Sequence, residues 1–369
     1  MEQRDDRRRS RKIREMRRLK RRRKRRRRIV FLIAEILILC ILGGIAYGIS
    51  KLDKLNVNPL KNLTNNGISQ KGYLNIAIFG NDKRPEDTGN ARSDCMIIAS
   101  INNDTKEVKM VSVYRDTLLK IDDDTYDKAN AAYAEGGPEA AVNMLNRNMD
   151  LDIQDYVSVN FLAVADVVDL LGGIDLDMTY EEVVHMNNYC VETSKITGKD
   201  YKKINPEKAG IYHLNGVQAV SYSRIRYTAG GDFQRTSRQR LVIEKIAEKA
   251  KKADLSTINK IIDAVFPEIT TSLTSGEIVK MAASMMKYSI GDNEGFPMDN
   301  QTPESIPGYR GSYVVPEGLE ENVVKLHKFL FPDEKYVPTD TLQEISDHIA
   351  NATGIYPGAS EDSTEDSKE

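Results

Sequence analysis

Aspartate and arginine side chains recur at the ends of predicted strands, and together they suit a phosphorylated ligand with a divalent cation. Asp82 follows the first of these strands, Asp94 directly precedes the second, and Arg115 lies two residues after the end of the third. Arginine binds phosphate oxygens bidentately and stays charged. Mg²⁺ takes one or two protein carboxylates together with substrate phosphates. These residue types therefore indicate phosphoryl-group chemistry, which depends mainly on positioning and charge neutralisation.

A second group of polar residues lies further along the chain. Arg224 and Arg226 close a predicted helix, and Asp232 precedes the next one, where an N-cap is the ordinary alternative. Three more residues have the spacing i, i+3, i+4 and share one face at a helix start: Arg235, Arg238 and Gln239. Backbone N–H groups at a helix start also attract an anion. Isolated Arg–Asp pairs are commonly surface ion pairs, so the ligand interpretation rests on the whole set.

The first group of charged residues depends on a predicted hairpin. Residues 102–106 (NNDTK) are turn-forming and connect two apolar segments, so these segments should pair antiparallel. The start of one strand and the end of the next then lie at one edge, which places Asp94 beside Arg115. Asp82 joins them if the first two strands are also antiparallel. The three strands are predicted at 74–80, 95–101 and 108–113.

The remaining pattern alternates between helices and strands. Further strands are predicted at 156–160 and 174–178, and a loop rich in Gly and Pro at 291–318. Helices are predicted at 138–148, 161–171, 215–224, 236–253 and 276–288. This mixture predicts an α/β fold with a central mixed β-sheet flanked by helices on both faces.

Composition excludes several classes of protein. Hydrophobic residues make up 40% of the 369 residues, which excludes a wholly disordered chain. Three Cys and four scattered His lack the spacing of a disulfide scaffold or a zinc site. Cys95 in a strand and Cys190 in a loop are expected to be isolated thiols, although a disulfide between them stays open. No Walker A, GxSxG or HExxH pattern supports nucleotide, serine or zinc hydrolase chemistry.

The N-terminal region predicts a membrane anchor. Residues 1–28 contain 18 Lys or Arg and 4 Asp or Glu, whereas the rest contains 35 basic and 51 acidic residues. Residues 29–49 are apolar except for Glu35 and are long enough to span a bilayer once. The basic tail should stay in the cytoplasm, which places the main domain outside the cell membrane. Its position beside the anchor favours contact with anionic lipid over nucleic-acid binding.

Composition also sets the expected boundaries outside the membrane. Residues 50–72 are polar and predict a linker, and 358–369 predict a disordered acidic tail. The charged groups described above fall within 73–250, which is the expected catalytic domain. Residues 251–357 show no chemistry of their own and are expected to complete the fold.

The order of these motifs resembles the LytR–CpsA–Psr (LCP) family. The resemblance covers about residues 74–250, and its specificity comes from the agreement of many motifs in sequence order. The single N-terminal anchor with a basic cytoplasmic tail is also typical of the family. The matching segments are 79–84 (FGNDKR), 92–94 (RSD), 114–117 (YRDT), 128–137 (KANAAYAEGG), 170–174 (LLGGI), 214–219 (LNGVQA), 222–226 (YSRIR), 231–235 (GDFQR) and 238–239 (RQ).

The resemblance implies a transferase of Gram-positive cell envelopes. Such enzymes move an anionic glycopolymer, a teichoic acid or capsule-like polysaccharide, from a polyprenyl-pyrophosphate carrier to the 6-hydroxyl of N-acetylmuramic acid in peptidoglycan. Carried over by position, Asp82 and Asp94 would hold Mg²⁺ or Mn²⁺, and Asp94 or Asp232 would assist deprotonation. The polyprenyl tail would lie in an apolar tunnel beside the predicted helix 161–171. The pyrophosphate would contact Arg92, Arg115, Arg224, Arg226, Arg235, Arg238 and Gln239.

Two other functions stay open on the sequence. The same residues with water as acceptor would make a polyprenyl-pyrophosphate phosphatase. Without turnover, the arginines would make a membrane-anchored regulator that binds polyanions in the envelope. The sequence leaves the oligomeric state and the particular glycopolymer unassigned.

Overall fold

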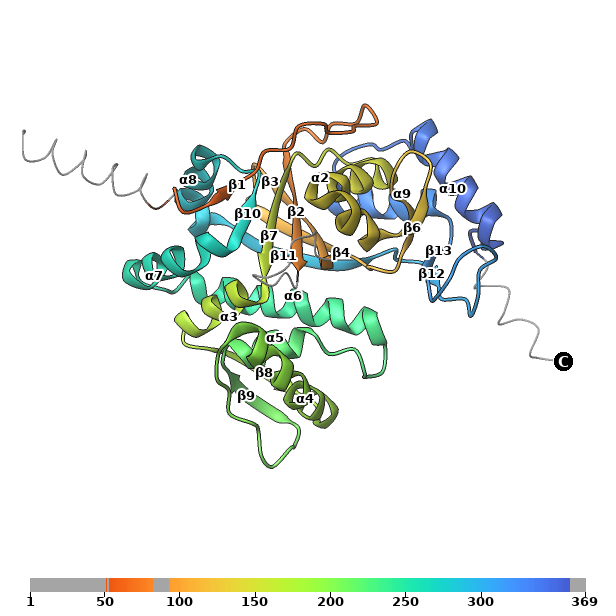
Figure 1. Cartoon of the computed structure of the whole chain (residues 1–369). Coiled ribbons are helices and arrows are strands. Elements are labelled where there is room, and N and C mark those ends of the chain that lie inside the picture. The colour runs from red at the N-terminus through yellow and green to blue at the C-terminus, as the bar shows by residue number, and fades with distance from the viewer. Residues whose placement is uncertain (1–50, 52, 82–92, 359–369) are drawn as a thin grey trace, which may run out of the picture. The chain divides into compact units, whose positions relative to one another are not determined.

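A mixed seven-stranded sheet forms the centre of the computed structural model, in which residues 51, 53–81 and 93–358 are described (Figure 1). The chain divides into two units, Met1–Asp53 and Lys54–Glu369, and the sheet belongs to the second. In spatial order the strands are β1 (Asn56–Val57), β10 (Ile269–Thr271), β7 (Asp155–Asn160), β2 (Tyr73–Asn81), β3 (Ser93–Asn102), β4 (Glu107–Val113) and β11 (Ser289–Phe296).

The three strands predicted to carry the first charged group are confirmed, with their pairing. β2 runs antiparallel to β3, and β3 forms an antiparallel hairpin with β4. Gly80 pairs with Cys95 and Met96 pairs with Val113, so the end of β2, the start of β3 and the end of β4 share one edge. β7 lies parallel to β2 on its other side.

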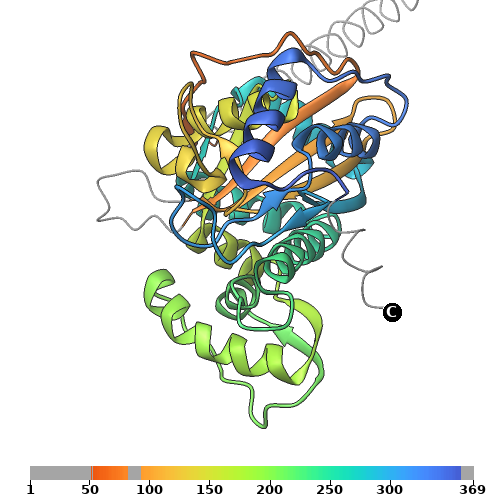
Figure 2. The same ribbon diagram turned by 90° about the vertical axis from the view of Figure 1, so that its right-hand side faces the viewer.

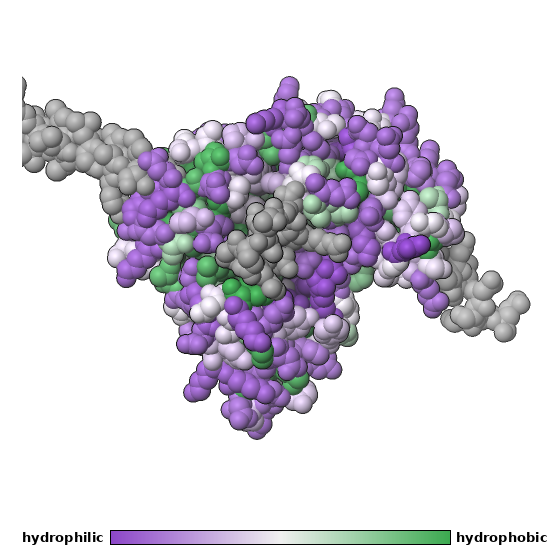
Figure 3. Space-filling view, in the orientation of Figure 1, coloured by the Kyte–Doolittle hydropathy of each residue, from purple (hydrophilic) through white to green (hydrophobic). Residues whose placement is uncertain are grey.

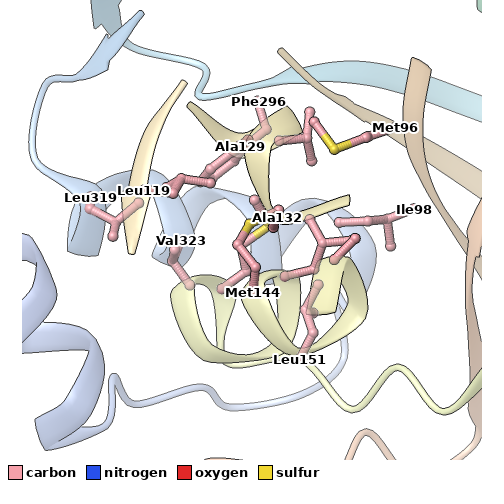
Figure 4. Packing of buried hydrophobic residues seen from close by; sticks show 14 of the residues in the cluster. Met96, Ile98, Leu119, Ala129, Ala132, Met144, Leu151, Phe296, Leu319 and Val323 are labelled. Carbon is pink, nitrogen blue, oxygen red and sulfur yellow. The ribbon is translucent and has the colours of Figure 1, made fainter. Parts of the chain in front are cut away.

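Helices cover both faces of the sheet, as expected. Ala77 and Phe79 of β2 point into a core shared with α2, α9 and α10, which Figure 4 shows around Met144 and Val323. Ile76 and Ile101 point to the opposite face, where they pack with residues of α8. Figure 2 shows α10 crossing in front of the strands and α6 below them. The helices on these two faces are α2 (Ala129–Met149), α6 (Gly231–Ala250), α8 (Ser275–Ser284), α9 (Leu319–Leu330) and α10 (Asp340–Thr353).

A second core lies beside the sheet edge that bears the charged residues. The strands β8 (Ile174–Met178) and β9 (Gly210–Leu214) pair antiparallel and share this core with α4 (Tyr180–Thr197) and α5 (Gly216–Ser223). Capping boxes fix the starts of both helices, from Thr179 to Glu182 and from Asn215 to Gln218. The other elements are α3 (Phe161–Leu170), α7 (Leu255–Val265), the short 3₁₀ helices Phe266–Glu268 and Met285–Lys287, and the strands β5 (Leu118–Lys120), β6 (Tyr126–Lys128), β12 (Asn300–Gln301) and β13 (Val315–Pro316).

Two helices begin earlier than predicted. The helix expected at 138–148 is α2, which starts at Ala129 because Gly137, with φ +68°, lets the chain kink before Pro138 and continue. The helix expected at 236–253 is α6, which starts at Gly231. Its N-cap is Gly230, so Asp232 lies inside the first turn and does not cap the helix.

The predicted position of Cys190 is wrong. It lies in α4, which the sequence reading missed, and its side chain is fully buried in the second core. Cys95 lies on β3 as predicted. Both are free thiols, which confirms that they do not form a disulfide with one another.

The loop predicted at 291–318 is wrong in its first part, because β11 extends through Phe296 and pairs parallel with β4. The register shifts between Ile290 and Asn293, which marks a bulge. Glycine at position 295 makes room for a neighbouring side chain, since a Cβ here would overlap the hydroxyl of Tyr114. The short strands β12 and β13 also fall within the predicted loop.

Part of the predicted linker contacts the domain. β1 pairs with β10, and Asn66 donates a hydrogen bond of 2.7 Å to the carboxylate of Asp150 at the end of α2. Asp150 is fully buried and also accepts bonds from the Tyr336 hydroxyl at 2.6 Å and from the Thr339 backbone and hydroxyl at 2.9 and 2.7 Å. This carboxylate therefore joins the segment after β1, α2 and the segment before α10.

Among the described residues, no helix is both long enough and apolar enough to cross a bilayer. The anchor predicted at 29–49 lies outside these residues.

The buried His327 predicts a pH dependence of stability. Its Nε2 lies 2.9 Å from the carbonyl of Met149, and burial lowers the pKa of the imidazole despite that hydrogen bond. An unfolded chain binds this proton near pH 6.5, so the free energy of unfolding should decrease as the pH falls through that value. Urea titrations would measure the free energy of unfolding at pH 5.5 and at pH 7.5. The difference between these two values should be smaller for His327→Gln than for the wild type. Equal differences would contradict the role of His327.

Candidate anion-binding site

Asp94 and Arg115 meet at the shared sheet edge, as predicted. Arg115 lies two residues after the end of β4, and its Nη1 donates a hydrogen bond of 2.8 Å to Oδ1 of Asp94. The Arg115 carbonyl accepts a bond from the backbone of Asn130 at the start of α2, which holds this segment against the helix. The Nε of Arg115 also contacts the carboxylate of Asp116 at 3.3 Å. The antiparallel hairpin thus brings Asp94, near the start of β3, together with Arg115, just after the end of β4.

Two arginines from the second charged group reach the same aspartate. Nη2 of Arg226, which follows α5, donates to Oδ2 of Asp94 at 2.9 Å. Nη2 of Arg235, from the second turn of α6, donates to the Asp94 carbonyl oxygen at 3.0 Å. Asp94 therefore organises three guanidinium groups that come from distant parts of the sequence.

Arg235 is the most buried of these arginines, with 2% of its side chain exposed. Its Nη2 contacts Oδ1 of Asp232 at 2.9 Å. Its Nε and Nη1 have no hydrogen-bond partner among the described residues. Buried donors without partners are costly, and burial lowers the pKa of this guanidinium although Asp232 opposes the shift. An anion beside these two nitrogen atoms would satisfy them.

The environments of the two aspartates push their pKa values apart. Burial acts to raise the pKa of Asp94, but the hydrogen bond and charge of Arg115, with the charges of Arg235 and Arg226, hold it below its usual value. Burial raises the pKa of Asp232 above its usual value, although Arg235 and Arg115 oppose this. Asp94 is therefore suited to hold cations, and Asp232 is the stronger proton acceptor of the two.

A polar cavity adjoins an apolar one at this site. The first, called here the arginine cavity, has a volume of about 180 Å³ and is lined by Gly80, Asp94, Cys95, Phe161, Tyr189, Ser223, Arg224, Arg226, Arg235 and Gln239. The second, the apolar cavity, has about 240 Å³ and includes Val164 of α3, Val220 of α5 and Ile246 of α6 in its walls. Five residues line both: Gly80, Cys95, Phe161, Ser223 and Gln239. Figure 3 shows apolar side chains gathered near α3 and the adjacent part of α6.

The other predicted residues have different surroundings. Arg224 lines the arginine cavity but donates to Glu192 at 2.8 Å and Thr193 at 2.9 Å. Gln239 lines both cavities, and its Oε1 is buried with no partner among the described residues. Arg238 does not join this group: it contacts Glu182 at 2.9 Å and donates to residues of the turn before α6.

Asp82 and Arg92 lie outside the described residues. Among those described, no group of three or more His, Cys, Asp or Glu could hold a metal ion. Of the residues that the structure describes, Asp94 alone supplies a carboxylate to the wall of the arginine cavity. A carboxylate has about four lone-pair positions, so the bonds from Arg115 and Arg226 leave room for a cation. This donor set fits an ion held largely by substrate phosphates.

Sequence reasoning missed two aromatic residues of the arginine cavity. The guanidinium carbon of Arg224 lies 4.8 Å from the ring centre of Phe161 and 5.5 Å from that of Tyr189. Tyr189 belongs to α4, so no local pattern linked it to Arg224. The capping box at 179–182 was the available signal for this helix.

A mixed β-sheet flanked by helices, with arginines and aspartates gathered at one edge beside an apolar cavity, defines an α/β protein with a candidate anion-binding site. The chain belongs to the LytR_cpsA_psr family, whose model matches residues 47–302. Members of this family are transferases. The functions named for the homologues indicate that the family transfers glycopolymers to peptidoglycan.

Individual relatives agree with this assignment. The chain is 27% identical over 310 residues to the polyisoprenyl-teichoic acid–peptidoglycan teichoic acid transferase TagU of Bacillus mycoides, covering 80% of this chain and 95% of that one. The fold is similar to protein gbs0355 of Streptococcus agalactiae, with TM-score 0.59, 24% identity and coverage of 80% and 96%. It is also similar to TagT bound to LI-WTA, with TM-score 0.53, 20% identity and coverage of 82% and 100%.

Proposed function

We propose that this protein transfers an anionic glycopolymer, a teichoic acid or capsule-like polysaccharide, from polyprenyl pyrophosphate to the 6-hydroxyl of N-acetylmuramic acid in peptidoglycan. The observation that carries the proposal is the junction of the arginine cavity with the apolar cavity. A pyrophosphate held by Arg115, Arg226 and Arg235 would place its lipid chain toward α3, α5 and α6. The name of TagU and the ligand of TagT support this substrate class.

In the proposed reaction, the acceptor oxygen attacks the phosphorus atom that bears the glycopolymer. A new P–O bond forms, the bond from this phosphorus to the bridging oxygen breaks, and polyprenyl phosphate leaves. The arginines stabilise the charge on the phosphoryl oxygens and on the leaving group. Asp232 accepts the proton of the attacking hydroxyl. Asp94 and Asp82 would hold Mg²⁺ or Mn²⁺, which when bound adds positive charge near the phosphates.

The choice of Asp232 as proton acceptor predicts a pH profile. Because burial raises its pKa, the acidic limb of kcat/KM should lie above the usual aspartate value of about 3.9. Asp232→Asn should remove that limb and lower kcat about 100-fold, a typical loss for a general base. The matched variant Asp116→Asn should keep the limb. A wild-type limb that persists in Asp232→Asn would assign the proton to another group.

The proposed location follows from the sequence. We propose that residues 29–49 span the cell membrane once, with residues 1–28 in the cytoplasm and the transferase domain outside. Labelling of single cysteines introduced at positions 5 and 365 with a membrane-impermeant reagent would test this. Labelling of the C-terminal position alone in intact cells is expected, and labelling of the N-terminal position would refute the orientation.

The function can be tested with the full-length protein in detergent. It would receive Mg²⁺, a polyprenyl-pyrophosphate-linked saccharide and peptidoglycan oligomers, and the products would be followed by mass spectrometry. We expect a phosphodiester-linked conjugate that EDTA abolishes and Mg²⁺ or Mn²⁺ restores. Release of the saccharide phosphate into water without attachment would indicate the phosphatase. Binding without turnover would indicate the polyanion-binding regulator.

A further inference from the structure

Three aromatic rings lead away from the arginine cavity, and we call them the aromatic strip. Tyr189 and His185 lie one turn apart on α4, and Tyr227 comes from the turn between α5 and α6. The ring centres of Tyr189 and Tyr227 are 6.5 Å apart, and those of His185 and Tyr227 are 6.2 Å apart. Two elements that are distant in sequence thus build one surface.

The strip is accessible. Tyr227 is 74% exposed, and the other two rings are partly exposed. A tyrosine ring has little conformational freedom, so it offers contact area to a ligand at a small entropic cost. Most of the Tyr227 ring is therefore available to a ligand, because the side chain lies at the surface and is not packed into a core.

The strip and the apolar cavity meet the arginine cavity at different aromatic rings. Tyr189 belongs to both the strip and the wall of the arginine cavity, whereas Phe161 lines the apolar cavity. The guanidinium of Arg224 contacts both rings. A pyrophosphate in the arginine cavity has two substituents, and the wall of this cavity borders the apolar cavity at Phe161 and the strip at Tyr189.

We propose that the aromatic strip binds the saccharide joined directly to the donor pyrophosphate, an inference that rests on the proposed function. A pyranose ring has C–H groups that pack on an aromatic face and hydroxyl groups that remain in water or bond to tyrosine and histidine. The lipid substituent is suited to the apolar cavity, so the sugar leaves on the side of Tyr189. The strip is therefore a specificity-determining surface for the donor.

Binding measurements with the full-length protein in detergent test the proposal. The probes are polyprenyl pyrophosphate, the same lipid bearing one N-acetylglucosamine, and a free N-acetylglucosamine oligosaccharide. Tyr227→Ala should raise the Kd of the sugar-bearing lipid roughly ten-fold, the loss of one ring contact, and leave that of the sugar-free lipid unchanged. Tyr180→Ala is the matched control, because Tyr180 is an exposed tyrosine at the start of α4 outside the strip.

The outcomes separate this inference from the proposed function. Equal Kd values for wild type and Tyr227→Ala with the sugar-bearing lipid would overturn the inference while the lipid binding supports the function. If only the KM for peptidoglycan oligomers increased, the strip would bind the acceptor and the donor assignment would be wrong. If the wild type bound neither lipid, the proposed function would fail. In that case, weaker binding of the free oligosaccharide by Tyr227→Ala would still support a saccharide strip.

Discussion

Replacing Arg235 with lysine should lower kcat/KM for transfer about 1,000-fold. Arg235 has two buried nitrogen atoms with no hydrogen-bond partner among the described residues, and its third guanidinium nitrogen, Nη2, binds Asp94 and Asp232. Lysine keeps the charge but has one compact ammonium group, so it cannot replace this fork of donors. Removing one preorganised donor to a developing charge typically costs 100- to 1,000-fold, and here two donors are lost.

The matched control is Arg240→Lys, because Arg240 is also a buried arginine of α6. It contacts Asn293 and Ser237 and belongs to neither cavity wall. Both variants should show similar thermal unfolding, and only Arg235→Lys should lose activity. Equal losses would mean that the effect comes from the packing of α6. Full activity in Arg235→Lys would refute a direct contact between Arg235 and the phosphates.

Replacing Asp150 with alanine should reduce the free energy of unfolding by about 3–5 kcal/mol. Four donors from Asn66, Tyr336 and Thr339 converge on its buried carboxylate. Without it these donors lose their partner inside the protein, at about 1–3 kcal/mol for each that water cannot reach. Asp150 is also the C-cap residue of α2, and its backbone has a left-handed conformation, with φ +48°, which alanine adopts less readily.

Two companion variants separate the contributions of the backbone and the carboxylate. Asp150→Gly relieves the left-handed conformation but still removes the acceptor, so it should remain strongly destabilised. The Asp150→Asn variant readily adopts the left-handed backbone conformation and keeps one acceptor oxygen. Its free energy of unfolding should therefore lie between those of the wild type and Asp150→Ala. Urea unfolding followed by circular dichroism would measure all three. If Asp150→Gly were as stable as the wild type, backbone strain would explain the effect and the hydrogen bonds would not.

The sequence predicted the sheet edge because the relevant signals are local. Apolar segments on either side of 102–106 determine the hairpin, and the hairpin alone brings Asp94 to Arg115. The contacts of Arg226 and Arg235 with Asp94 needed more information, since they depend on how α5 and α6 pack beside the sheet. The charges and the order of the family motifs indicated Arg226 and Arg235 as site residues. The same signals also indicated Arg238, and they did not predict that Arg238 pairs with Glu182.

The elements that were missed lack a regular apolar pattern. α4 buries Asn187 and Thr193 beside Val183 and Met186, so its inner face is partly polar and its period is hard to see. Asn187 tolerates burial because its amide bonds to the Ile204 backbone and Glu207. β11 contains two glycines, and one of them is explained only by the position of Tyr114, the residue after the neighbouring strand β4.

The two margins of the central sheet offer poor templates for another chain. At one margin β1 has only two residues, and at the other β11 is bent by its bulge between Ile290 and Asn293. A long, flat margin exposes a row of amide and carbonyl groups to which a strand of another molecule can add. Among the described residues, neither margin of this sheet has such a row of free backbone groups. Copies of the protein should therefore resist edge-to-edge aggregation even at high concentration.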